Sequence, residues 1–496
     1  MAQNNMERKP WCYRPPQKAK GTSQNPFSLG VLSRLPLAES FHELWGYLAT
    51  DDVLDDLFER HRGRCYHDTL SFAELLGVLV EAITRFRGSG NRAISSALRS
   101  QQLSTQGRTV YDKLARLPLP LAEAFLSGLT ARLRPLFPAG ICRNQLPTSL
   151  NGLSVVVLDG KTIKKAAKRL LCTRGRPGKL HGGKILAAYL PAQGLVVALA
   201  ADPDGEANDI RLMPRVLPLA REAVTGPRLW VADSQFCDLD QTTRFTDEDD
   251  HFLLRFTLRN SFTADPTRPS GAGVTASGQA FTQEWGWMGV ETNQRRRYVR
   301  MIRLERPGEA AVILVTDLLD EQVYSAVDLL ATYLMRWQIE TVFQEITEVF
   351  ELRHLIGSTP RATVFQASLC LVIYNILQLV RGYVAAGRPE PVKVEEVSTE
   401  KIFEDMHEQL VSLHTVLSSE ELVPCLKVPK TLDEMKHRLA TRLGNLWSPR
   451  WKKSVNKKRR PVQAKAKQSG AHTSVHKLLQ QAKQQHKDHP STHQRK

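Results

Sequence analysis

The stretch that decides the fold is SVVVLDGKT, residues 154–162. Its first half is β-branched and apolar, which predicts a short buried strand, and Asp159 follows that strand directly. A second stretch, RLWVADS at 228–234, ends in the same way with Asp233. Two aspartates placed just past buried strands indicate an acidic site at the edge of an α/β sheet. Each Asp taken singly is also a common turn former or helix cap, so only the pair is informative.

A third acidic residue lies in YLMRWQIETVFQEIT, residues 333–347. Tyr333, Arg336 and Glu340 are spaced by three and four residues, so a helix at about 100° per residue brings them to one face. Most other positions are apolar, and we expect them to bury the helix on its remaining sides. A buried Arg and Glu either neutralise each other or serve chemistry, because an unpaired buried charge is costly. The helix alone leaves both interpretations open.

The three carboxylates together favour chemistry. Asp159, Asp233 and Glu340 would repel one another at close range unless a divalent cation lay among them. Oxygen-only ligands of this kind suit Mg²⁺ or Mn²⁺. Two such ions activate a water or a 3′-hydroxyl and stabilise the leaving oxygen of a phosphoryl displacement. The three residues are therefore predicted to be catalytic metal ligands in a nuclease or a strand-transfer enzyme.

These segments resemble the DDE-class insertion-sequence transposases of the "insertion sequence four" group. That group carries a signature helix Tyr-x2-Arg-x3-Glu-x6-Lys, which Tyr333, Arg336 and Glu340 match. The position of the Lys is occupied by Thr347, which is a departure from the pattern. The resemblance covers roughly residues 150 to 380 and also rests on VVVLDGKT at 155–162, LAAYLPAQGLVVALAADPDGEANDI at 186–210 with its Glu206 and Asp209, FLLRF at 252–256, and Trp337.

The resemblance implies a ribonuclease-H-like α/β core, interrupted by a β-rich insertion that helps to hold flanking DNA. It implies a DNA transposase of a mobile element that binds transposon ends and target DNA as a homodimer. Two Mg²⁺ ions, or Mn²⁺ in their place, would support cleavage, a hairpin step and strand transfer in cut-and-paste transposition. Tyr333 and Arg336 would contact DNA phosphates. A Thr hydroxyl at 347 makes such a contact only weakly, and Arg353 is a candidate replacement for the missing Lys.

The charge of the chain agrees with a nucleic-acid partner. It carries 68 Lys and Arg against 51 Asp and Glu, which gives a formal net charge of +17. Lys161 and Lys164 follow Asp159 in a basic loop, and Arg255 ends another predicted strand, so we expect all three to contact DNA phosphates. Residues 91–116 resemble a helix-turn-helix, although exposed basic residues on helix pairs are common. Its candidate DNA contacts are Arg92, Arg99, Arg108, Lys113 and Arg116.

Hydrophobic patterning divides the chain into segments. Apolar residues at three- and four-residue spacing predict helices in the first third, and alternating apolar residues predict strands before the signature helix. The last segment is basic and poor in apolar residues, so it cannot bury enough surface to fold and would attract phosphates non-specifically. The predicted segments are a flexible N-terminus (1–30), an all-α DNA-binding domain (31–140), the first part of the core (150–250), the β-rich insertion (251–325), the second part of the core with C-terminal helices (326–445), and a disordered basic C-terminal tail (446–496).

The sequence argues against several other classes of protein. The best membrane candidate, residues 367–380, contains Asn375 and Gln378 and is shorter than a span of about 20 residues, so we expect a core helix and no membrane partner. The N-terminus lacks the apolar segment of a secretory signal, and the seven Cys lack CxxC spacing. These features predict a bacterial cytoplasmic protein that associates with the nucleoid through DNA.

Two rival functions remain open. Another ribonuclease-H-like DNA nuclease would share the three carboxylates but would lack the β-rich insertion and the Tyr–Arg stripe. A catalytically weakened, transposase-derived DNA-binding protein would rely on the basic tail. Thr347 favours this second rival, whereas the intact set of carboxylates favours catalysis.

Overall fold

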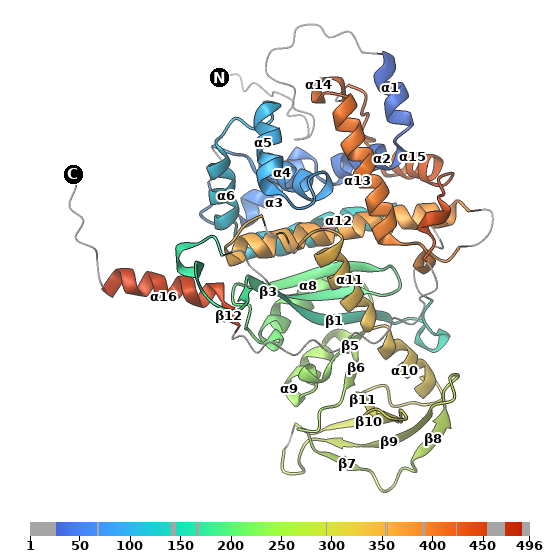
Figure 1. Cartoon of the computed structure of the whole chain (residues 1–496). Helices are drawn as coiled ribbons and strands as arrows, with labels where there is room; N and C mark the ends of the chain where they lie inside the picture. Colours follow the sequence, from blue (N-terminus) through green and yellow to red (C-terminus); the bar gives the residue numbers. More distant parts are fainter. Residues whose placement is uncertain are drawn as a thin grey trace, which may run out of the picture.

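Figure 1 shows the computed structural model, in which a helical layer lies over a large sheet that continues into a β-rich extension. The chain is a mixed α/β protein, as the sequence predicts. The structure describes residues 26–66, 69–138, 140, 145–164, 168–293, 295–352, 354, 356–388, 392–422, 424–453 and 472–488.

Both strands that precede the predicted aspartates belong to one sheet, which has ten strands in the described part of the chain. Its order is β4-β3-β1-β5-β6-β11-β10-β9-β7, with β8 paired to β9. β1 runs antiparallel to β3 and parallel to β5, and β5 runs parallel to β6. Residues 155–158 are fully apolar and buried, which suits a strand in the middle of a covered sheet. The core strands are β1 (Ser154–Ile163), β3 (Gly183–Leu190), β4 (Leu195–Asp202), β5 (Arg228–Ala232) and β6 (His251–Arg255).

The β-rich extension continues the same sheet with antiparallel strands rather than forming a second sheet. β6, which the sequence assigns to the insertion, is a core strand parallel to β5. Trp285 is buried within the extension and donates its Nε1 hydrogen to the Leu319 carbonyl (2.9 Å), so it stabilises the extension. The strands of the extension are β7 (Phe262–Ala264), β8 (Gly271–Val274), β9 (Ala280–Met288), β10 (Arg297–Leu304) and β11 (Val312–Thr316).

The N-terminal helices share a hydrophobic core with the sheet. α7 packs on β4 and on α12, and Phe125 of α7 lies 5.4 Å from Phe365 of α12 between ring centroids. Glu123 of α7 accepts a hydrogen bond from the Ala201 backbone of β4 (2.8 Å). These helices are α1 (Pro26–Ser33), α2 (Pro36–Leu48), α3 (Asp51–His61), α4 (Phe72–Thr84), α5 (Gly90–Arg99), α6 (Gly107–Arg116) and α7 (Leu119–Leu133).

The helix α12 (Pro360–Ala386) lies between the N-terminal helices and the sheet (Figure 1). It is the helix in the described residues that is long and apolar enough to cross a membrane, and its most apolar window is entirely buried inside the protein. The sequence-based expectation of a core helix therefore agrees with its position. The remaining helices outside the site are α8 (Met213–Ala223), α9 (Leu239–Phe245), α13 (Thr399–Val416), α14 (Ser419–Leu422) and α15 (Leu432–Leu443).

The tail predicted to be disordered over 446–496 contains an ordered segment. Thr473–Ser474 forms β12, which pairs parallel with β2 (Leu180–His181), and α16 (Val475–Asp488) follows it. Val475 and Leu478 are buried. The prediction was wrong here because the few apolar residues of the tail are concentrated where they pack, which average composition conceals. Residues 454–471 and 489–496 lie outside the described part.

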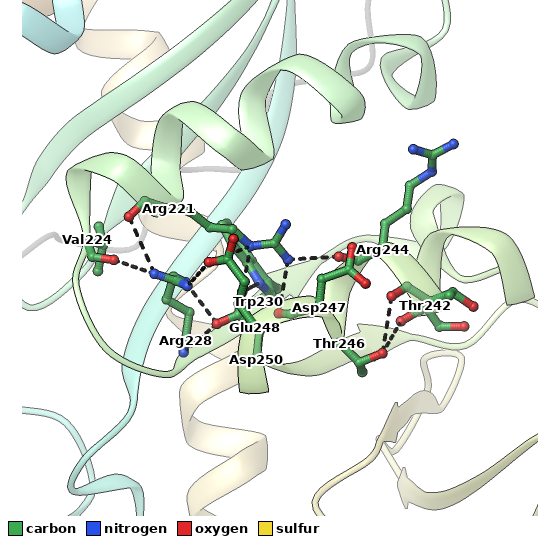
Figure 2. A network of polar contacts seen from close by, with 11 residues as sticks. Arg221, Val224, Arg228, Trp230, Thr242, Arg244, Thr246, Asp247, Glu248 and Asp250 are labelled. Carbon is green, nitrogen blue, oxygen red and sulfur yellow. Dashed lines mark hydrogen bonds and ion pairs between the residues drawn. The ribbon is translucent and has the colours of Figure 1, made fainter.

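A buried network holds the amino end of β5 (Figure 2). The Asp250 carboxylate accepts hydrogen bonds from the backbone and side chain of Arg228 (2.9 and 2.8 Å), from Trp230 Nε1 (2.9 Å) and from Arg221 Nε (3.0 Å). The carboxylate is fully buried, and its two Arg partners supply the charge that offsets its desolvation. The network fixes the start of β5, and Asp233 follows the other end of the same strand.

Candidate active site

Strand register brings the two predicted aspartates together. In the parallel pair of β1 and β5, Val157 lies opposite Val231. The parallel pairing ends there, and Asp159 and Asp233 each follow two residues later, so both lie just past the same end of the β1–β5 pairing. Asp159 remains within β1 and pairs with Ala187 of β3, whereas Asp233 leaves β5 and precedes the 3-10 turn η6 (Ser234–Phe236).

The signature segment faces these aspartates, but it is not one continuous helix. α10 (Ala326–Leu334) ends before Met335, and α11 (Trp337–Glu348) begins after Arg336. Between them the backbone hydrogen bonds span three residues, as in Arg336 N to Tyr333 O (3.0 Å). Side chains three residues apart are eclipsed in such a tight turn, so Tyr333 and Arg336 still share a face.

The expected burial of the apolar side of this segment is only partly correct. Ile339, Val342, Phe343 and Ile346 are buried, as predicted. Leu334 and Trp337 are each 55% exposed, because the break between the two helices turns them away from the core. The Trp337 ring lies near the Arg336 guanidinium, with 5.0 Å from Cζ to the ring centroid.

The guanidinium of Arg336 lies among the predicted acidic residues. Its Nη1 atom is 3.1 Å from Glu340 Oε1 and 3.9 Å from Asp159 Oδ2. Burial acts to lower the pKa of Arg336, but the surrounding tyrosine and carboxylates outweigh burial and raise it. These groups are Tyr333, Asp159, Asp233 and Glu340. The structure therefore places Glu340 and Asp159 beside one buried cation, with Asp233 close enough to raise the pKa of that cation.

Asp159 is the most perturbed of the three carboxylates. Burial raises its pKa to about 6, Arg336 opposes the rise, and the nearby Glu340 adds to it. The ionised form is therefore costly without further positive charge. Asp233 has a buried Oδ1 atom with no hydrogen-bond partner. Both observations fit a group of carboxylates that binds a cation.

The side chains of this centre have the right donor atoms for a metal ion, but their positions in this structure do not yet form a coordination site. Within the described ranges, no three His, Cys, Asp or Glu side chains are placed, as they stand, to share a metal ion. The Arg336 guanidinium lies between the carboxylates instead. The donor set consists of oxygen atoms only, which suits Mg²⁺ or Mn²⁺. Binding a metal here requires Arg336 to withdraw from Asp159 and Glu340.

The predicted phosphate-binding residues lie around this centre. Lys161 is on the same side of β1 as Asp159, and its Nζ lies 5.4 Å from the centroid of the Phe343 ring on α11. Burial and the neighbouring Lys164 lower the pKa of Lys161 to about 8. Lys164 is exposed just beyond β1. Arg255, at the end of β6, is close enough to Tyr333 to act on its pKa, which burial raises.

Thr347 offers no free hydroxyl to a phosphate in this structure. Its Oγ1 donates a hydrogen bond to the Phe343 carbonyl one turn earlier (2.6 Å). Arg353, the other candidate for the missing Lys, lies outside the described residues. Of the basic residues predicted on the helix pair α5–α6, Lys113 is buried and donates to the Tyr66 carbonyl (3.0 Å), so it is not a DNA contact.

Sequence reasoning missed a role for Asp209, in the 3-10 turn η5 (Asp209–Leu212). It is buried beside the backbone of Gly160, where its carboxylate acts on Asp159. The Glu-x-x-Asp turn was visible in the sequence as part of the family resemblance. Its contact with β1 was not, because only folding brings residues 160 and 209 together.

An acidic centre formed by two adjacent parallel strands and a helix, with cations around it, is typical of enzymes that displace phosphoryl groups with divalent metals. Residues 150–376 match the family model of the transposase DDE domain, and this range contains all three carboxylates. The match supports a DDE-class transposase, a class that generally uses divalent metal ions and acts on DNA. The mixed sheet with its many helices is consistent with a DDE transposase fold. A comparison with curated proteins found no match.

Proposed function

We propose that this chain is a DNA transposase of the "insertion sequence four" group that binds transposon ends and catalyses their cleavage and strand transfer. The observation that carries the proposal is that Asp159 and Glu340 both lie at Arg336, with Asp233 just past the neighbouring strand β5. Three carboxylates, one within β1, one just after the adjacent β5 and one on α11, would form the donor set of a ribonuclease-H-like active site. Cut-and-paste transposition through a hairpin follows from the family resemblance.

In this proposal Asp159, Asp233 and Glu340 hold two Mg²⁺ ions, or Mn²⁺ in their place. Ions held by these carboxylates would supply activation of the attacking water or 3′-hydroxyl and stabilisation of the leaving oxygen. Arg336 neutralises the carboxylates before binding and then moves to a DNA phosphate, together with Tyr333. A guanidinium suits this exchange because it binds carboxylates and phosphates equally well in a fork geometry.

The basic residues around the centre position the DNA backbone. Two of them belong to the β1 region, where Lys161 lies on the strand and Lys164 just beyond it. Arg255 ends β6, so basic side chains flank the carboxylates from two strands. Contacts to phosphates fix register without reading sequence. End recognition is assigned to α5 and α6, where Arg92, Arg99 and Arg108 are exposed. We infer a homodimer on DNA, active in the cytoplasm and on the nucleoid.

The test uses the DNA that flanks the coding region, where paired inverted repeats would mark the transposon ends. Purified wild-type protein should cleave such an end in Mg²⁺ and join its 3′-hydroxyl to target DNA. Asp159→Ala, Asp233→Ala and Glu340→Ala should each lose cleavage while still binding the end. Equal cleavage by all four proteins would refute the site assignment.

A weakened, DNA-binding descendant of a transposase is the second candidate, because the Thr347 hydroxyl is engaged within its own helix. This protein would bind the same ends but would not cleave them in Mg²⁺ or Mn²⁺. Another DNA nuclease on the same core would cleave DNA without inverted repeats. One cleavage and binding assay with repeat-containing and scrambled ends separates the three functions.

A further inference from the structure

Asp209 lies behind β1, on the side away from the signature helix. Successive side chains of a strand point to opposite faces. Asp159 and Lys161 face α11, so Gly160 and Thr162 face the other way, and Thr162 Oγ1 donates to the Gly205 carbonyl there (3.2 Å). A Cβ added at Gly160 would come within 2.3–2.4 Å of the Asp209 carboxylate. The carboxylate therefore packs directly on the backbone next to Asp159.

The same carboxylate joins three elements of the site. Its Oδ1 pairs with Lys184 Nζ on β3 (2.8 Å), and its Oδ2 accepts a hydrogen bond from Gln235 Nε2 in η6 (2.8 Å). Asp233 immediately precedes η6, and its carbonyl accepts the Phe236 backbone N–H (3.0 Å). The contact to Gln235 thus ties the turn that carries Asp233 to the back of β1.

The Asp209–Lys184 ion pair adds no net charge to the site, because its two opposite charges cancel. Both side chains are largely buried, at 7% and 15% exposure. A buried ion pair of this kind contributes little net stability compared with apolar packing. The Asp209 carboxylate instead holds two elements in a fixed relative position, because one of its oxygens contacts β3 and the other contacts the turn after β5.

We propose that Asp209 is a positioning residue that fixes Asp233 relative to Asp159, so that the two carboxylates bind the same divalent cation. This inference rests on the proposed function. Asp209 acts through Gln235 and through the Gly160 backbone, and it touches neither DNA nor metal. Neighbours that orient metal ligands typically change metal affinity or activity by about 10- to 100-fold when they are replaced.

The test exchanges the two partners of the hydrogen bond. In Asp209→Asn the amide oxygen still accepts from Lys184, but the NH₂ faces Gln235, whose amide must turn over to accept in place of donating. In Gln235→Glu two carboxylates face each other. The double variant restores the bond with reversed polarity, because the introduced amide would donate to the introduced carboxylate. Glu206→Gln, three residues before Asp209, is the matched control, because it also removes a carboxylate that pairs with a lysine, here Lys477 of α16.

The main readout is Mn²⁺ affinity, measured by the decrease of the electron paramagnetic resonance signal of free Mn²⁺. Cleavage of the transposon end and the melting temperature are measured on the same variants. Gln235→Glu should bind Mn²⁺ about 10-fold or more weakly, Asp209→Asn should bind it more weakly than wild type by a smaller factor, and the double variant should return to within about threefold of wild type. A purely electrostatic effect would instead move the two single variants in opposite directions, because they change charge by opposite signs. That result would overturn the proposal.

Other outcomes separate this inference from the proposed function. A lower melting temperature in both single variants with unchanged Mn²⁺ affinity would show a merely structural role and overturn the inference. Wild-type protein that binds Mn²⁺ but cleaves no transposon end would refute the proposed function, while the Mn²⁺ series would still decide the role of Asp209. Wild-type protein that binds no Mn²⁺ would overturn both.

Discussion

Asp159→Asn is expected to stabilise the protein in the absence of metal. Burial raises the pKa of Asp159 from 3.8 to about 6, so its ionised form is disfavoured in the folded state. The difference of about 2 pKa units corresponds to about 3 kcal/mol, at about 1.4 kcal/mol per unit. An Asn of the same shape avoids this cost while Arg336 keeps Glu340 as a partner. The same variant should abolish cleavage.

The pH dependence follows from the direction of the shift. A group whose folded pKa is raised retains its proton in the folded state over a range in which the unfolded chain has lost it. The destabilisation by Asp159 is therefore complete above pH of about 6, decreases as the pH falls, and disappears below about 4. The advantage of Asp159→Asn should be about 3 kcal/mol at pH 7.5 and roughly half of that at pH 5.

Thermal unfolding in EDTA at these two pH values measures the effect. For a chain of this size, 3 kcal/mol corresponds to a rise in melting temperature of about 3 °C. Glu408→Gln, an exposed carboxylate on α13, is the control and should shift the melting temperature by less than about 1 °C. Mn²⁺ should raise the melting temperature of the wild type and not of Asp159→Asn. A variant that melts no higher than wild type at pH 7.5, or gains more at pH 5, would refute the reasoning.

Three further substitutions test other parts of the molecule. Gly160→Ala should displace the Asp209 carboxylate and reduce cleavage about 10-fold, measured beside circular dichroism to show that the fold persists. Asp250→Ala should lower the free energy of unfolding by about 3–5 kcal/mol in denaturant titrations, because two buried Arg lose their partner, whereas Glu248→Gln at the exposed edge of that network should cost less than about 1 kcal/mol. Thr347→Lys should tighten binding of the transposon end and steepen its salt dependence by about one phosphate contact; an unchanged slope of log Kd against log salt would contradict this.

Hydrophobic patterning was enough to locate the main elements of the core. The β-branched runs before Asp159 and Asp233 form β1 and β5, and alternating residues form the strands of the extension. These patterns are local, since period-2 or continuous burial follows from the geometry of a strand wherever it packs. The apolar run at 367–380 likewise predicted a core helix that the structure buries completely.

Several features of the candidate site could not be predicted in this way. The tight turn at Met335–Arg336, the exposure of Trp337 and the burial of Lys113 depend on how neighbouring elements pack. The ordered segment at 472–488 depends on the pairing of β12 with β2, almost 300 residues earlier in the chain. Composition averages over such pairings, because a few well-placed apolar residues are enough to anchor a short segment.

The sequence by itself determined which residues carry the acidic and basic groups, because side-chain chemistry and local spacing do not depend on contacts between distant parts of the chain. It supplied Asp159, Asp233 and Glu340, and the spacing that keeps Tyr333 near Arg336. Only the tertiary structure decided that the parallel pairing of β1 and β5 brings the two aspartates to the same end of these strands, that Arg336 lies between Asp159 and Glu340, and that Asp209 lies behind Gly160. These arrangements join residues that are far apart in the chain, and their positions are set by the combined packing of many elements rather than by any one stretch of sequence.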